Sequence, residues 1–178
     1  MTNVVVIYHS LFGHTKLMAE NVAAGALAQL IEIDENGDIT GAEWDAMHAA
    51  DAIIFGSPTY IGTVSWQFKK FIDHTSKEWF QRKWVDKIAG GFTISSSPSG
   101  DKLLTLQTMM IMASQLGMIW ISQELLNRNG HNRLGSYVGV MADCRSQDAP
   151  DKIPAGDLET AKLYGERVAR LTAKFKGV

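Results

Sequence analysis

VVVIYHSLFGHT, residues 4–15, joins two kinds of sequence. Its first five residues form a continuous apolar run, which is typical of a strand covered on both faces of a parallel sheet. The remainder is polar, contains Gly13, and is followed directly by a helical period. The stretch therefore predicts a buried strand, a tight polar loop and the start of a helix.

Similar apolar runs recur along the chain. They predict four more strands, the first of them the weakest, at residues 30–34, 52–56, 89–95 and 118–122. Helical periods lie between the strands, at residues 17–30, 64–75, 106–113 and 158–169. The sequence Thr40-Gly41-Ala42-Glu43 predicts a capping box that opens a further short helix. Strands and helices therefore alternate.

This alternation predicts a parallel sheet with right-handed crossovers and helices on both faces. The chain has 178 residues, a length that fits one domain and is short for a (β/α)8 barrel. We predict a single flavodoxin-like domain over residues 1–178, an α/β fold with a doubly wound five-stranded parallel sheet in the order 2-1-3-4-5. Residues 123–156 are expected to form a long functional or interfacial loop with a short strand at 137–142.

Composition narrows the class of protein. The chain is 46% hydrophobic and 20% charged and has no apolar run as long as a membrane span. We expect a soluble, cytoplasmic protein with no membrane partner, because the first residues do not resemble a signal peptide. The net charge is -2 with 17 dispersed Lys and Arg residues, which argues against nucleic acid as a partner and against a small acidic electron carrier.

Single reactive side chains give weak signals. Cys144 is the only cysteine, so no intrachain disulfide can form, and we interpret it as an inert thiol. The five histidines show no metal-ligand spacing, and we expect no metal site. The methionines of residues 109–118 are interpreted as core residues.

Ligands of doubly wound sheets bind beyond the carboxyl ends of the strands, where three loops of this chain meet. In the first loop, residues 10–15, Ser10 and Thr15 supply hydroxyls and Gly13 allows a tight turn. The helix that starts near His14 offers unpaired N–H groups, and this combination suits a phosphate. The same spacing also occurs in ordinary turns and helix caps. The loop is neither a dinucleotide-binding G-x-G-x-x-G motif nor a Walker A motif.

The second loop, residues 56–63, and the third loop, residues 95–100, follow the next two central strands. Pro58 stiffens the second loop, Gly62 frees it, and Tyr60 either supports a flat ligand or covers the surface. The third loop is a dense set of hydroxyl and N–H donors, or a polar turn. Convergence of the three loops favours a binding site over three unrelated turns.

Several segments carry a family resemblance. They are SLFGHT (10–15), DAIIFGSPTYIG (51–62), QFKKFIDHT (67–75), Trp79, residues 95–118, QELL (123–126) and the final helix LETAKLYGERVARLTAKFKG (158–177). In order and spacing they resemble the WrbA family of flavodoxin-like NAD(P)H:quinone oxidoreductases. The resemblance spans nearly the whole chain, and the P-T-x-x-G loop after the DAIIFG strand is its most specific part.

The resemblance implies one FMN per subunit. Its phosphate would be held by Ser10, Leu11, Phe12, Gly13, His14 and Thr15. Its isoalloxazine would lie along Pro58, Thr59, Tyr60, Ile61 and Gly62. Its pyrimidine side would be closed over by Ser96, Ser97, Pro98, Ser99 and Gly100. Phe12 would lie near the nicotinamide and Trp79 near the quinone. Without the resemblance, Trp79 is interpreted as a residue of core or subunit packing.

The activity implied by the resemblance is a ping-pong reaction. NADH or NADPH gives a hydride to FMN N5 and leaves, and a quinone or similar flat acceptor then takes two electrons. The chemistry belongs to the cofactor, so no side chain is assigned a catalytic role. Family members are usually tetramers with sites completed by neighbouring subunits, and we expect a homo-oligomer, either a dimer or a homotetramer.

Two other functions stay open from sequence. One is an FMN-binding electron carrier that a partner protein reduces, and the other is a flavodoxin-like interaction module without flavin. The chain departs from the family at Tyr60 and Ile61, which replace Arg-Phe, and at Pro98 and Asp101, which replace glycines. It also has Leu116 in place of a histidine, and a short connection over residues 34–44.

Overall fold

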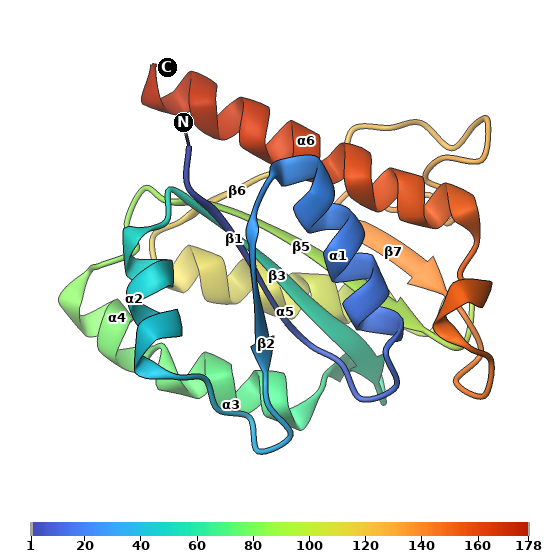
Figure 1. Cartoon of the computed structure of the whole chain (residues 1–178), viewed down its shortest axis with the longest axis horizontal. Coiled ribbons are helices and arrows are strands. Elements are labelled where there is room, and N and C mark those ends of the chain that lie inside the picture. The colour runs from blue at the N-terminus through green and yellow to red at the C-terminus, as the bar shows by residue number, and fades with distance from the viewer. Residues whose placement is uncertain (1, 178) are drawn as a thin grey trace.

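A parallel sheet runs through the middle of the computed structural model, which describes residues 2–177 (Figure 1). Its strand order is β2-β1-β3-β5-β6. The strands are β1 Val4–His9, β2 Gln29–Ile33, β3 Ala52–Tyr60, β5 Ile88–Ser95 and β6 Ile119–Trp120. Because β4 (Thr63–Val64) is a short antiparallel partner of β3, β5 is the fourth parallel strand. The predicted order is therefore confirmed.

The fifth position of the sheet is divided between two short strands. β6 pairs with Ile88 and Ala89 of β5, whereas β7 (Val140–Asp143) pairs with residues 92–95 of the same strand. Residues 121–139 leave the sheet between them, and we call this segment the insert. The strand predicted at 118–122 is therefore shorter than expected, and the one predicted at 137–142 lies at 140–143. The remainder of the expected long loop contains the 3-10 helix Pro150–Lys152.

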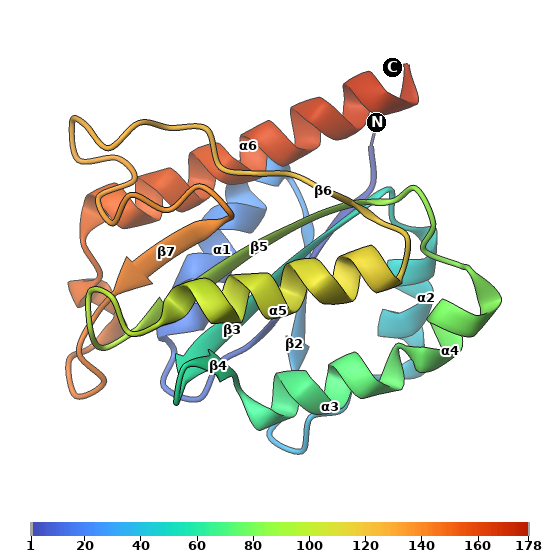
Figure 2. The same cartoon turned by 180° about the vertical axis from the view of Figure 1, so that it is seen from behind.

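Helices cover both faces of the sheet, as predicted (Figures 1 and 2). On one face lie α1 His14–Ala26 and α6 Ala155–Lys176. On the other lie α2 Gly41–Ala49, α3 Trp66–His74, α4 Ser76–Gln81 and α5 Lys102–Gln115. The sequence did not predict α4, and α1 ends before residue 30 because Leu27 adopts a positive φ of 52° and β2 follows at once. Within residues 2–177, no helix has both the length and the apolar composition to cross a membrane.

Two hydrophobic cores explain the unbroken apolar runs. Val4, Val6 and Tyr8 face the core under α1 and α6, whereas Val5 and Ile7 face the core under the other helices. Every position of β1 is therefore buried. The second core contains Met47, Met109, Met112 and Met118. The prediction that the methionines of residues 109–118 are core residues is therefore confirmed for Met109, Met112 and Met118.

The helices α1 and α6 touch through their backbones. A Cβ atom at Gly25 would lie 1.9 Å from the carbonyl oxygen of Lys162, and one at Gly165 would lie 2.1 Å from that of Val22. Real Cβ atoms do not approach so closely, so only glycine fits at these two crossings. This contact fixes α1, whose N-terminus follows the first loop.

Two sets of polar contacts fix the ends of individual helices and strands. The predicted capping box is confirmed: the Thr40 hydroxyl accepts from Glu43 N–H, and Thr40 N–H donates to Glu43 Oε2 over 2.7 Å. The Asp51 carboxylate accepts from Asn3 N–H at 2.8 Å and from Lys176 Nζ at 2.6 Å. Asp51 therefore ties the start of β1 to the end of α6.

Candidate functional site

A cavity of about 800 Å³ opens at the carboxyl ends of the central strands. Residues of the first, second and third loops line it together, as the sequence analysis expected of a binding edge. Its volume lies in the range of roughly 300–1,000 Å³ that is typical of small-molecule sites. The lining residues are Ser10, Leu11, Phe12, His14, Thr15, Pro58, Thr59, Tyr60, Ile61, Gly62, Ile94, Ser95, Ser96, Ser97, Gly100, Asp101, Cys144 and Ser146.

The first loop is organised by the hydroxyl of Ser10. Its oxygen accepts hydrogen bonds from the N–H groups of Gly13, at 3.1 Å, and Lys16, at 3.2 Å. A hydroxyl that accepts two hydrogen bonds still has its own hydrogen, so Ser10 retains a donor for an anion in the cavity. Ser10 is thus both part of the fold and a candidate ligand-binding residue.

The N-terminus of α1 faces the same cavity. Gly13 has a φ of 85°, and a Cβ there would meet Pro150 at 3.1 Å, so the turn requires glycine. Thr15 is only 2% exposed and still lines the cavity. The first N–H groups of a helix have no partner within the helix, and they add a partial positive charge. This end of the cavity suits a phosphate.

The ring of His14 joins the first loop to the chain beyond β7. Its Nε2 lies 2.9 Å from the carbonyl oxygen of Asp148. A carbonyl oxygen only accepts, so Nε2 carries the hydrogen and donates it. His14 therefore braces the loop, and its Nε2 hydrogen is not free for a ligand.

The second loop is the turn of a hairpin. β3 continues past the sheet and pairs with β4 through Tyr60 and Thr63, so that Ile61 and Gly62 form a two-residue turn. Both turn residues have positive φ, 47° for Ile61 and 80° for Gly62. A β-branched residue rarely adopts this conformation, and the Ile61 side chain is fully exposed. The turn therefore holds an apolar, strained residue at the mouth of the cavity.

Buried hydroxyls hold the second loop in place. Thr59 Oγ1 lies 2.8 Å from Thr93 Oγ1 and 2.7 Å from Thr105 Oγ1, which links β3 to β5 and to α5. Beside it, burial raises the pKa of the Tyr60 phenol, which is therefore neutral at physiological pH. The wall formed by Tyr60 is thus aromatic and uncharged.

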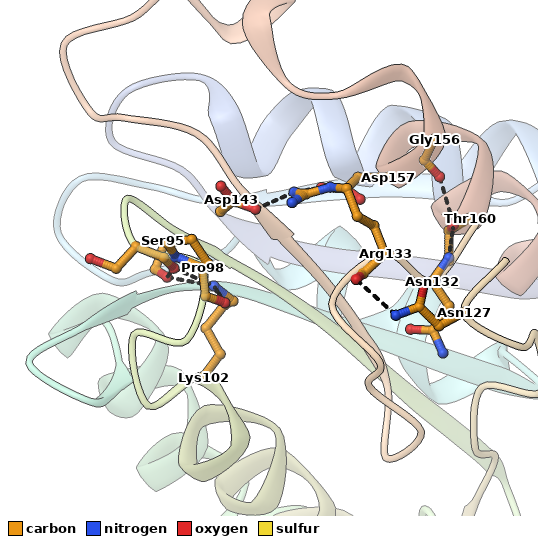
Figure 3. A network of polar contacts seen from close by, with 11 residues as sticks. Ser95, Pro98, Lys102, Asn127, Asn132, Arg133, Asp143, Gly156, Asp157 and Thr160 are labelled. Atoms are coloured by element: carbon orange, nitrogen blue, oxygen red, sulfur yellow. Dashed lines mark hydrogen bonds and ion pairs between the residues drawn. The ribbon is translucent and has the colours of Figure 1, made fainter. Parts of the chain in front are cut away.

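The third loop is held from below by Lys102, the first residue of α5 (Figure 3). The Lys102 side chain is fully buried, and its Nζ donates to Ser95 Oγ at 2.8 Å, Ser97 O at 2.7 Å and Pro98 O at 3.0 Å. Gly100 has a φ of 54°, and a Cβ there would lie 2.4 Å from Ser95 Oγ. The loop is therefore tightly folded over a buried cation.

One wall of the cavity, formed by residues after β7, was not predicted from the sequence. Cys144 and Ser146 line the cavity because β7 runs parallel to β5 and ends at the same edge. Ser146 N–H also donates to Ser96 Oγ at 3.1 Å. Burial raises the pKa of the Cys144 thiol, which stays protonated and acts as an apolar wall. The short strand predicted at 137–142 was the available signal for this wall.

The other residues that sequence reasoning missed lie next to predicted ones. Ile94 and Asp101 line the cavity on either side of the predicted third loop, whose first residue, Ser95, lines it too. Conversely, Gly13, Pro98 and Ser99 belong to the loops without lining the cavity. Gly13 shapes its turn, and Pro98 turns its carbonyl to Lys102.

Trp79 lies away from this cavity. It lines a second hollow of about 420 Å³ between α3, α4 and α5, together with Ile72, Ile111 and Met112. Its side chain is 47% exposed. Within one chain the structure therefore brings Phe12, but not Trp79, to the predicted cofactor cavity.

The described residues contain no cluster of side chains with the composition of a metal site. Among residues 2–177, no three His, Cys, Asp or Glu side chains gather in a way that would hold a metal ion. His9 is buried, and burial lowers the pKa of its imidazole, with Glu32 opposing the shift.

Comparisons with known proteins agree with the fold and identify the family. A family model described as NADPH-dependent FMN reductase matches residues 2–132. A protein named Flavodoxin FldP, from Pseudomonas aeruginosa, is 49% identical over 178 residues. The alignment covers 96% of this chain and 97% of that protein. An NAD(P)H dehydrogenase (quinone) of Archaeoglobus fulgidus is 32% identical, with 98% of this chain and 100% of that protein covered.

A solved structure is equally similar. The crystal structure of a flavodoxin, WrbA-like protein from Agrobacterium tumefaciens superposes with a TM-score of 0.85 at 48% identity, covering 98% of this chain and 99% of that one. The chain therefore belongs to the NADPH-dependent FMN reductase family and, within it, to the WrbA-like proteins of flavodoxin fold.

Proposed function

We propose that this protein is an FMN-dependent oxidoreductase that transfers two electrons from NADH or NADPH to quinones or similar flat acceptors. The observation that supports it most is the meeting of the three loops around one cavity, with the N-terminus of α1 at one end. The family match and the relatives named NAD(P)H dehydrogenase (quinone) support the same chemistry.

The cavity suits each part of FMN. The Ser10 hydroxyl, the Thr15 side chain and the first N–H groups of α1 would hold the phosphate. Pro58, Tyr60 and the polar third loop would enclose the isoalloxazine and meet its polar edge. Bound FMN would supply a centre that takes a hydride from the nicotinamide and passes two electrons to the acceptor.

The chain's own residues would orient and shield the reactants. Leu11, Phe12 and Ile61 are exposed apolar side chains around the cavity, between 55% and 103% exposed. They would give a flat apolar acceptor or a nicotinamide ring a surface to stack on and would exclude water from it. We assign no proton transfer to a side chain.

We also propose that the working form is a homo-oligomer, a dimer or a tetramer. Trp79 and Phe80 of α4 are exposed apolar residues, 47% and 79% exposed. If a neighbouring subunit completes the site, Trp79 would reach the acceptor across that contact. Trp79→Ala should then raise the KM for the quinone while leaving FMN affinity unchanged. Loss of FMN with normal turnover per bound FMN would instead make Trp79 a packing residue.

An alternative function is an FMN-binding electron carrier that a partner protein reduces. The relative named Flavodoxin FldP favours it. The net charge of -2 speaks against it, because a carrier that is steered electrostatically needs a stronger field of one sign. The two functions differ in whether a nicotinamide alone can reduce the flavin.

An anaerobic titration separates them. The purified protein is loaded with FMN and titrated with NADPH and, separately, with NADH while the visible flavin absorbance is followed. Bleaching by either nucleotide, reversed by benzoquinone, is the expected result and also identifies the preferred donor. A bound flavin that neither nucleotide bleaches would indicate the carrier. Failure to bind FMN would exclude both functions.

A further inference from the structure

Lys102 is an unusual residue for its position. It is the first residue of α5, and its side chain is fully buried behind the third loop. Lysine side chains are almost never fully buried unless they are paired. All three ammonium hydrogens are used here, on Ser95 Oγ, Ser97 O and Pro98 O. The side chain is therefore part of the loop's architecture.

These acceptors determine what the third loop can present to the cavity. Two of the three are backbone carbonyls, and the ammonium of Lys102 at the start of α5 occupies both as acceptors (Figure 3). Carbonyl oxygens would repel the acceptor oxygens at the polar edge of an isoalloxazine, whereas hydroxyl and N–H donors would bind them. Ser95, Ser96, Ser97 and Gly100 line the cavity in the resulting conformation.

The charge of Lys102 balances the charges of three neighbouring side chains. Asp143 on β7 and Asp157 on α6 raise the pKa of Lys102, whereas Arg133 of the insert lowers it. Arg133 pairs with Asp143 and, at 2.8 Å, with Asp157, whose side chain is only 1% exposed (Figure 3). The two cations and two carboxylates sum to zero. Without Lys102 the group would carry a net negative charge beside the cavity.

We propose that Lys102 is a positioning residue of the flavin site: it holds the third loop in its ligand-binding conformation and supplies a positive charge near the polar edge of the isoalloxazine, which carries acceptor oxygens and gains negative charge on reduction. The proposal rests on the proposed binding of FMN. The charge of Lys102 should also raise the reduction potential of the bound flavin, because reduction adds electrons to the flavin and a nearby cation stabilises the reduced state.

The protonation state of Lys102 gives the proposal a pH signature. Burial lowers the pKa of this lysine to about 8, against the opposing influence of Asp143 and Asp157. A neutral amine has only two hydrogens, so it cannot serve all three acceptors, and it carries no charge. By linkage, binding of an anion in the cavity should raise the pKa of Lys102 again.

Lys102→Met is the direct test. Methionine is unbranched, apolar and a good helix former, so it fills the same space without charge or donor. The FMN dissociation constant should rise about tenfold or more, and the reduction potential of bound FMN should fall. The FMN dissociation constant of Lys102→Met, divided by that of the wild type, should become smaller above about pH 8, where the wild-type lysine loses its proton.

Lys87→Met is the matched control. Lys87 also donates to two backbone carbonyls, those of His48 and Ala50, and burial also lowers its pKa. It precedes β5, at the end opposite to the cavity. This variant should bind FMN with wild-type affinity and potential. Equal losses in both variants would mean a general effect on stability and would overturn the proposal.

A measurement without flavin separates this proposal from the proposed function. In the flavin-free protein, amide hydrogen exchange over residues 95–101 should be faster in Lys102→Met than in the wild type, with β1 and β3 unchanged. If wild type fails to bind FMN, the proposed function fails, while exchange still tests the loop. Unchanged exchange together with unchanged FMN affinity would overturn the role of Lys102.

If Lys102→Met does not fold, an NMR titration of the Lys102 ammonium in the wild-type protein tests the proposal. The pKa of Lys102 should rise when FMN is added, and an unchanged pKa would refute the proposal.

Discussion

The hydroxyl of Tyr164 closes a gap in the sheet by bonding to the backbone of Gly91. It accepts a hydrogen bond from Gly91 N–H at 3.1 Å and donates one to the carbonyl of Ile121 at 2.7 Å. Gly91 lies on β5 between the residues that pair with β6 and those that pair with β7. The hydroxyl thus takes the place of the strand that the insert interrupts.

Tyr164→Phe should therefore lower the free energy of unfolding by about 1–3 kcal/mol, because the buried Gly91 N–H and the partly buried Ile121 carbonyl lose their partner. Urea denaturation of the flavin-free protein measures this value. Tyr137→Phe is the control, since Tyr137 is 47% exposed and should change stability by less than about 0.5 kcal/mol. Equal stability of Tyr164→Phe and wild type would show that the gap does not depend on the hydroxyl.

Thr15→Val should weaken FMN binding by about 1–3 kcal/mol, the range for a lost hydrogen bond to a charged acceptor. Valine keeps the buried shape of Thr15, so the melting temperature of the flavin-free protein should change little. Ser10→Ala should lower both the affinity for FMN and the melting temperature of the flavin-free protein, because the Ser10 hydroxyl also accepts hydrogen bonds from the N–H groups of Gly13 and Lys16. Fluorescence titration with FMN measures the affinity. Wild-type affinity of Thr15→Val would remove Thr15 from the phosphate site.

Ile61→Asn should raise the free energy of unfolding by about 1 kcal/mol, because asparagine tolerates the positive φ that strains isoleucine. The same change removes an exposed apolar surface, so the KM for a quinone should increase. Ile61→Val retains the β-branch and should gain no stability. A quinone KM that does not change would show that Ile61 has no contact with the acceptor.

The stability of the flavin-free protein should increase between about pH 8 and about pH 10 through Lys102. The native pKa of about 8 lies below the ordinary value of 10.5. In this window the unfolded chain binds a proton that the native chain has lost, so raising the pH favours the native state. Below about pH 8 the native protein holds Lys102 in its charged form, and burying this charge destabilises the fold. Urea unfolding of wild type and Lys102→Met across the window measures the difference, and parallel pH profiles would mean that Lys102 stays protonated.

The sequence predicted the strand order and the three loops because their signals are local. The apolar run of residues 4–8 is buried at every position, and the capping box at Thr40 forms as its spacing indicates. Both depend on residues within one element. The meeting of the loops at one edge then follows from the parallel arrangement of the strands.

The features that the sequence did not predict depend on contacts between distant residues. The gap between β6 and β7 is filled by the hydroxyl of Tyr164, which is far from both strands in sequence. Cys144 reaches the cavity only because β7 resumes the sheet. Lys102 looks like an ordinary residue at the start of a helix. Its burial becomes visible only when the third loop folds over it.

The Asp51 carboxylate has a practical consequence for handling the protein. By bonding to both Asn3 and Lys176, it holds the two ends of the described chain side by side at the amino end of the sheet (Figure 1). The cavity opens at the opposite end. A purification tag, a fluorescent reporter or a peptide that tethers the protein to an electrode can therefore be fused at either end without covering the mouth of the cavity.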